Sequence, residues 1–167
     1  MTKEKVDLLL SNHRENVGRC LHLQAEIAEL QSSIADAERN LATDLAWAHS
    51  YELSDMPHGT AVSQPTEKIG LQLASGWKPD YIVTMQQRLA ECEREQQERE
   101  INRMFVDGWL KGLPERERWL IENQVIDKVF WRDILIRYRQ RFGTDLSKDT
   151  LQRVKARALE QIYAMAR

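Results

Sequence analysis

The sequence has few of the residues that interrupt helices and few that cross-link a chain. Its 167 residues include only 7 glycines, 4 prolines and 2 cysteines. Glycine and proline are the least favourable residues in a helix, so their scarcity favours an all-helical fold. Cys20 and Cys92 fit a reducing compartment, where cysteines behave as small apolar residues.

Long apolar segments are also missing. No run of about 18 apolar residues exists, so no transmembrane helix is expected. The first ten residues carry Glu4 and Asp7 and contain no small-residue cleavage site, which argues against a signal peptide. With 42% hydrophobic and 30% charged residues, the chain is too apolar to be disordered and too charged for a membrane protein. We therefore expect a cytoplasmic protein with no membrane partner.

Residue patterns typical of catalysis or metal binding are absent as well. His13, His22, His49 and His58 have no metal-ligand spacing with the two cysteines. There is no glycine-rich phosphate loop and no recognisable Cys-His pair. The carboxylates lie in helical charge runs, where ion pairing is their usual role. We expect no enzyme activity, no metal site and no other cofactor.

The charges that are present are distributed unevenly. The net charge is only −2, but residues 128–167 hold 10 Lys and Arg against 4 Asp and Glu, an excess of 6. Residues 1–60 have the opposite balance, with 5 basic against 10 acidic residues. A local field steers encounter, so a polyanion would meet the C-terminal end first. Charge alone does not distinguish a nucleic-acid partner from a solvated helix face.

An apolar stripe predicts one long helix over residues 3–49. The stripe runs from Val6 to Leu41 with alternating steps of three and four residues, and it includes the polar residues His13 and Asn16. β-branched residues at a positions with leucine at d positions favour a two-stranded coil. The residues expected to mediate oligomerisation are Leu9, Leu23, Ile27, Leu30, Ile34 and Leu41. The second strand is either another copy, giving a homodimer, or a later helix of the same chain.

That later helix is expected over residues 80–111. A turn-rich loop at 54–66 and a short helix at 67–75 precede it. Residues 93–100 include no apolar side chain, which is typical of a solvent-bridging spacer. We therefore place a boundary near residue 100.

The boundary separates a coiled-coil arm, residues 1–100, from a head, residues 101–167. In the head, apolar spacing resumes at Ile101, Met104, Phe105 and Trp109. Pro114 can open the next helix, whose expected core face is Trp119, Leu120, Ile121 and Val125.

Two further helices are predicted at residues 129–142 and 148–166. Gly143 is the expected C-cap of the first, and Ser147 is the expected N-cap of the second. A short glycine-containing turn joins these two helices, and the second is basic. This arrangement is typical of a helix-turn-helix motif, whose second helix binds in the major groove of DNA.

The candidate DNA-binding residues lie opposite the apolar stripe of that second helix and on the helix before it. Glutamine can pair with adenine and arginine with guanine, whereas lysine mostly contacts phosphate. The candidates are Lys148, Thr150, Gln152, Arg153, Lys155, Arg157, Arg139 and Arg141. The predicted partner is double-stranded DNA.

The head also resembles region 4 of sigma factors. The resemblance is carried by Leu113-Pro114-Glu115-Arg116-Glu117, Trp131-Arg132-Asp133-Ile134, Leu146-Ser147, and Thr150-Leu151-Gln152-Arg153 through Ala158-Leu159. With Met56-Pro57-His58-Gly59 and Ser63-Gln64-Pro65-Thr66, the chain is similar to the phage RinA and ArpU-type late transcription regulators. The interval from Ile134 to Ser147 is longer than in the sigma pattern.

The resemblance implies a phage or prophage late-gene activator that binds promoter-proximal DNA and contacts RNA polymerase. Two alternatives stay open. One is a phage small terminase subunit, which would form a ring on packaging-site DNA. The other is a coiled-coil adaptor whose basic tail binds an acidic protein.

Overall fold

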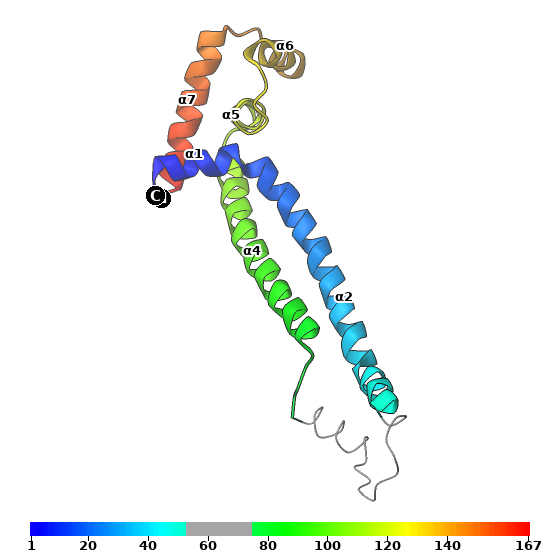
Figure 1. The fold of residues 1–167 in the computed structure, drawn as a ribbon. Coiled ribbons are helices and arrows are strands. Elements are labelled where there is room, and N and C mark those ends of the chain that lie inside the picture. Colours follow the sequence, from blue (N-terminus) through cyan, green and yellow to red (C-terminus); the bar gives the residue numbers. More distant parts are fainter. Residues whose placement is uncertain (53–74) are drawn as a thin grey trace, which may run out of the picture. The chain divides into compact units, whose positions relative to one another are not determined.

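The computed structural model describes residues 1–52 and 75–167, except for the side chains of residues 42 and 44–52. Every element in these ranges is a helix, which confirms the all-helical fold (Figure 1). The loop predicted at 54–66 lies outside the described residues, as does all but the last residue of the short helix predicted at 67–75.

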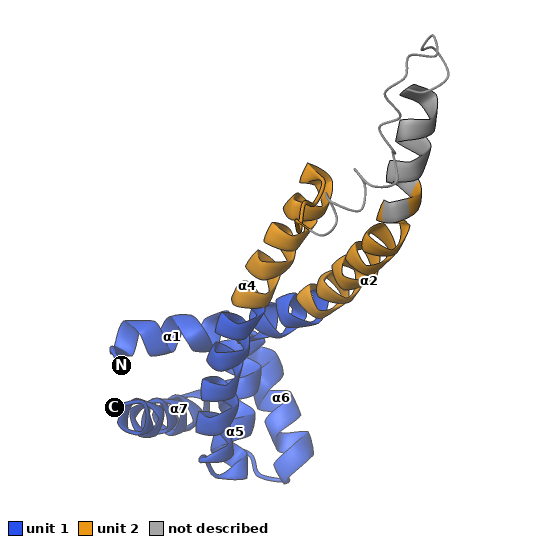
Figure 2. Ribbon diagram, turned by 90° about the horizontal axis from the view of Figure 1, so that it is seen from below, with its two compact units in different colours: residues 1–22, 96–167 blue, residues 23–95 orange. Residues whose placement is uncertain are grey.

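The described chain divides into two compact units (Figure 2). Unit 1 comprises residues 1–22 and 96–167, and unit 2 comprises residues 23–95. This division differs from the predicted boundary near residue 100, because the first 22 residues belong with the C-terminal helices instead of with the arm.

The predicted single helix over residues 3–49 is broken at Asn12. Helix α1 spans Lys3–Ser11 and α2 spans His13–Glu52, with Asn12 at φ −101° and ψ 3° between them. The Ser11 hydroxyl donates a hydrogen bond to the carbonyl of Leu8 at 3.0 Å. Serine and asparagine side chains compete with the backbone for such bonds and are therefore poor in helix interiors. The break allows α1 to pack into the core of unit 1.

Unit 2 is a pair of helices running side by side, α2 and the first part of α4, Asp80–Lys111 (Figures 1 and 2). Ion pairs cross between them. Arg88 Nη2 on α4 lies 2.7 Å from Glu26 Oε1, and Lys78 Nζ, just before α4, lies 2.6 Å from Glu38 Oε1. The second strand of the predicted coil, over these residues, is therefore a helix of the same chain.

The residues predicted to mediate oligomerisation are covered within the chain. Leu9 in unit 1 is buried, as are Leu23, Ile34 and Leu41 in unit 2, while Ile27 and Leu30 are half-buried. On α4, Ile82 and Cys92 are buried as well. A homodimer stays a prediction, and this stripe gives it no support.

The C-terminal helices agree with their predicted positions. They are α5, Glu115–Ile121; η1, Glu122–Ile126; α6, Trp131–Phe142; and α7, Lys148–Met165. Gly143 ends α6 with φ at 64°, and the Ser147 hydroxyl accepts a hydrogen bond from the backbone N–H of Thr150 at 3.3 Å. Both predicted caps are confirmed.

A local change of helix type was not predicted. The helix that follows Pro114 becomes a π-helix at Glu122, where the N–H of Asp127 donates to the carbonyl of Glu122 at 2.9 Å. Lys128 then adopts a positive φ of 54°. Such i to i+5 hydrogen bonds are rare, and no local feature of the sequence predicts them.

Two apolar clusters stabilise unit 1. The first joins α1 to later helices and contains Val6, Leu9, Leu10, Val106, Trp109, Leu110, Leu113, Ile121, Ile126, Ala158 and Ile162. The second lies among α5, α6 and α7 and contains Trp119, Leu120, Ile134, Tyr138 and Leu151. Of the apolar residues at the start of the head, Ile101, Met104 and Phe105 are exposed while Trp109 is buried. Their neighbours Val106 and Leu110 face the core instead.

Candidate nucleic-acid interface

The orientation of α7 is set by aromatic packing beneath its first turns. Leu151 is fully buried in the cluster with Trp119 and Tyr138. Trp119 meets the Tyr138 ring edge-on, with ring centroids 5.7 Å apart, and Phe142 lies 4.8 Å from Tyr138. Because Leu151 points inward, the residues on the opposite side of the same turns face solvent.

Four of the predicted contact residues are exposed in these turns, and they are Lys148, Thr150, Gln152 and Arg153. Lys148 and Arg153 form no ion pair, and Gln152 no hydrogen bond, with any part of the chain that the structure describes. The Thr150 hydroxyl lies 2.9 Å from that of Ser147 and so takes part in the cap. Three side chains at the start of α7 are thus available for an external partner.

Lys155 does not share this face. It lines a hollow of about 530 Å³ with Asp7 and Leu8 of α1 and Tyr163 of α7. Burial lowers the pKa of Lys155, and the carboxylate of Asp7 opposes that shift. The structure therefore places Lys155 toward α1, which differs from the outward orientation predicted from the helix period.

Arg157 has a partner inside unit 1. Its Nε and Nη2 both donate to Oε1 of Glu117 on α5, at 3.2 Å and 2.6 Å. Glu117 is buried, so this pair joins α5 to α7. The burial of Glu117 carries no local signal in the sequence.

The two candidates on α6 form exposed ion pairs. Arg139 Nη1 lies 3.4 Å from Asp145, and Arg141 Nη2 lies 3.2 Å from Glu115. The Arg141 guanidinium also lies 5.6 Å from the centroid of the Phe142 ring. Exposed pairs of this kind contribute at most about 1 kcal/mol, so a phosphate can compete for either guanidinium.

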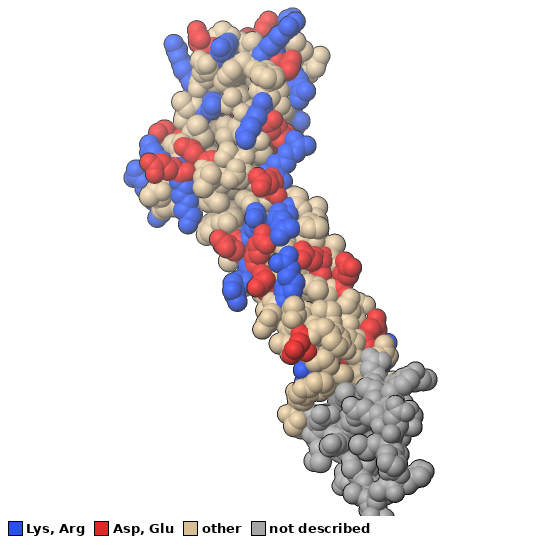
Figure 3. All heavy atoms as spheres, in the orientation of Figure 1, with Lys and Arg blue, Asp and Glu red and all other residues tan. Residues whose placement is uncertain are grey.

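Further cations surround the start of α7. Residues 128–153 carry 7 Lys and Arg against 3 Asp and Glu. Lys128, Arg132 and Arg137 are exposed and form no ion pair among the described residues. Figure 3 shows Lys and Arg side chains spread over the end of unit 1 that α6 and the start of α7 form. Sequence reasoning missed Lys128 and Arg132, although the helix period places Arg132 on the face opposite the core residue Ile134.

No protein-family model, curated protein or solved structure matches this chain. Within residues 1–52 and 75–167, no helix is long and apolar enough to cross a membrane. In the same ranges no group of three or more His, Cys, Asp and Glu side chains could hold a metal ion. A functional proposal therefore depends on the geometry of unit 1.

Proposed function

We propose that this protein is a sequence-specific DNA-binding transcription regulator that places the start of α7 in the major groove. One observation carries the proposal. The first turns of α7 expose Lys148, Gln152 and Arg153, while Leu151 anchors the same turns in the core. Reading helices of helix-turn-helix proteins contact base edges with their N-terminal residues.

Each side chain has a role that suits its chemistry. Gln152 offers an amide that can pair with both edge groups of adenine, and Arg153 a guanidinium that can pair with guanine. Lys148 lies in the first turn of α7, where its charge and the backbone N–H groups favour a phosphate. Arg139 and Arg141 would bind the DNA backbone by exchanging their exposed carboxylate partners for phosphates.

The regulatory role follows from the resemblance to sigma-factor region 4 and to RinA and ArpU-type regulators. On this basis the chain is a phage or prophage late-gene activator that binds near a promoter and contacts RNA polymerase. A homodimer would bring two α7 helices to paired half-sites and strengthen binding through effective concentration. The α2 stripe is covered by α4, so a dimer needs another surface.

The test begins with footprinting on the DNA that flanks the protein's own gene, at physiological salt. The protected sequence then serves as the probe for wild type and for Arg153→Glu. The matched control is Arg94→Glu, an exposed arginine on α4 in unit 2. Loss of a specific arginine contact costs about 1–3 kcal/mol, and reversal of its charge costs more.

We expect Arg153→Glu to abolish the footprint while Arg94→Glu keeps it. Lys148→Ala should weaken binding to all sequences alike and lower the salt slope by about 1, as for a phosphate contact. A footprint unchanged by Arg153→Glu would refute the assignment of α7 as the reading helix. Binding that is equally strong on unrelated DNA would argue against a sequence-specific regulator.

A further inference from the structure

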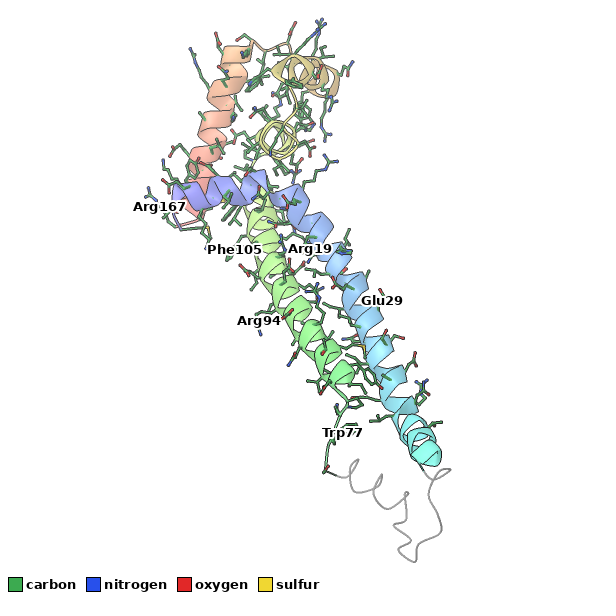
Figure 4. All side chains as sticks on the ribbon, viewed as in Figure 1. Arg19, Glu29, Trp77, Arg94, Phe105 and Arg167 are labelled. Atoms are coloured by element: carbon green, nitrogen blue, oxygen red, sulfur yellow. The ribbon has the colours of Figure 1, made fainter. Side chains whose placement is uncertain are left out.

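Helix α4 leaves one apolar strip uncovered in unit 1. Ile101, Met104 and Phe105 expose 42%, 56% and 45% of their surface, and the exposed Gly108 continues the strip by one turn. Figure 4 labels Phe105 on the side of α4 that lies away from α2. The opposite side of α4 carries the buried residues Val106 and Leu110, so rotating the helix cannot hide the strip.

The strip is shaped for close approach by another helix. A side chain placed at Gly108 would find no atom of the chain within 4 Å, so the surface there is open. Glycine lets a neighbouring backbone come closer than any other residue does. Beyond it, Met165 of α7 lies over Gly112 and extends the apolar surface, with 44% of its own surface exposed.

Charges at the two ends of the strip are opposite and symmetrically spaced. Glu98 lies three residues before Ile101, and Lys111 lies three residues after Gly108. Both are exposed, and neither forms an ion pair with another described residue. In two antiparallel copies of α4, Glu98 of one copy therefore lies opposite Lys111 of the other. Ile101 likewise lies opposite Gly108, and Met104 opposite Phe105.

We propose that a second copy of this chain covers the strip, with the two α4 helices antiparallel about a twofold axis near Met104 and Phe105. Ile101 of each copy then packs over Gly108 of the other. Glu98 lies at the level of Lys111 of the partner subunit, whereas a parallel pair would bring like charges to the same level. Such an interface is self-complementary, as a twofold dimer requires.

Two other features of the strip agree with a protein partner of this kind. Its exposed side chains are aromatic, aliphatic and methionine, the types that are enriched in the centres of interfaces. Its charged ends carry one residue of each sign, so it attracts neither a polyanion nor a polycation as a whole. The inference does not depend on DNA binding, because its first readout is the mass of the protein alone.

The experiment measures the mass of the full chain by sedimentation equilibrium and by native mass spectrometry, without DNA. We expect twice the chain mass of 19.6 kDa. Phe105→Asp should weaken the dimer by about tenfold or more, because the charge would be buried at the centre of the interface. The matched control is Leu21→Asp, which changes an exposed leucine on α2 in unit 1 that lies outside the strip.

A charge exchange tests the antiparallel order and uses only exposed positions, so folding is preserved. Glu98→Lys and Lys111→Glu should each weaken dimerisation, and the double variant should restore it. Circular dichroism confirms that each variant stays helical. A monomeric wild type, a larger ring, a dimer indifferent to Phe105→Asp, or a failure of the double variant to recover would each overturn the proposal.

Discussion

Arg157 on α7 donates two hydrogen bonds to a single carboxylate oxygen of Glu117 on α5, from Nε at 3.2 Å and from Nη2 at 2.6 Å. Glu117 is 4% exposed, and its other oxygen, Oε2, is buried without a hydrogen-bond partner in the described part of the chain. The pair ties the proposed reading helix to the helix beneath it. Arg157, which the helix period predicted to contact DNA, is therefore expected to stabilise unit 1.

Replacing Arg157 by alanine should destabilise the protein by about 1–3 kcal/mol, because a buried carboxylate loses its donor. Urea unfolding followed by circular dichroism measures the change. Arg153→Ala is the matched control on the same helix, and it should stay within about 0.5 kcal/mol of wild type because Arg153 is exposed. Equal stabilities of the two variants would show that the Glu117 contact contributes nothing.

Gly143→Ala should lower stability by about 1–2 kcal/mol, because φ at this position is 64° and a side chain is strained there. No atom lies within 4 Å of the added carbon, so the cost is conformational and not a clash. Gly18→Ala in α2 has equal space and an ordinary helical backbone. It should instead gain about 0.5–1 kcal/mol. The same sign for both changes in urea unfolding would contradict this account.

The stability of the protein should fall as the solution becomes acidic, in part through His13. Burial lowers the pKa of His13 below 6.5, and the nearby Asp107 carboxylate, 3.3 Å from Nε2, opposes the shift. Arg103 adds to the lowering, and Glu122 opposes it. The unfolded chain takes up this proton near pH 6.5, but the folded chain takes it up only at lower pH. The contribution is therefore present above pH 6.5 and is lost as pH falls through the folded pKa.

His13→Gln keeps a donor for Asp107 but removes the titration. The free energy of unfolding, measured in urea from about pH 7.5 to about pH 5, should fall less steeply for this variant than for wild type. Identical slopes would mean that His13 is not responsible.

At high pH, Tyr163 should become a source of instability. Burial raises the pKa of Tyr163 from 10.0 to about 12, and its hydroxyl donates a hydrogen bond to Asp7 of α1 at 2.7 Å. Above pH 10 the unfolded chain loses this proton more readily than the folded chain. The stabilisation is therefore complete below pH 10 and is lost as pH rises through about 12.

Tyr163→Phe removes both the hydrogen bond and the titration. It should be less stable than wild type at neutral pH by about 0.5–1.5 kcal/mol, and its stability should fall less as the pH is raised above neutral. Thermal unfolding across this range provides the measurement. A variant with the same alkaline loss as wild type would assign that loss to other groups.

The position of the candidate site was predictable from the sequence. Which basic residues are free to contact a partner there was less predictable. Ser147, Gly143 and the stripe through Leu151 are local signals, because capping and helix periodicity depend on residues close in the chain. Lys148, Gln152 and Arg153 are exposed, as these signals predicted. The partners of Lys155 and Arg157 come from α1 and α5, which are distant in sequence, and no local pattern reports such contacts.

The sequence by itself determined where most of the helices lie, the caps at Gly143 and Ser147, and the buried stripe of α2, since these follow from spacing within single segments. Only the tertiary structure decided what covers each face. The first helix is broken at Asn12, and α1 packs into the core of unit 1. The α2 stripe is covered by α4 of the same chain, whereas Ile101, Met104 and Phe105 stay exposed. The physical reason is that a helix period indicates which residues share a face, whereas burial depends on which other segment reaches it.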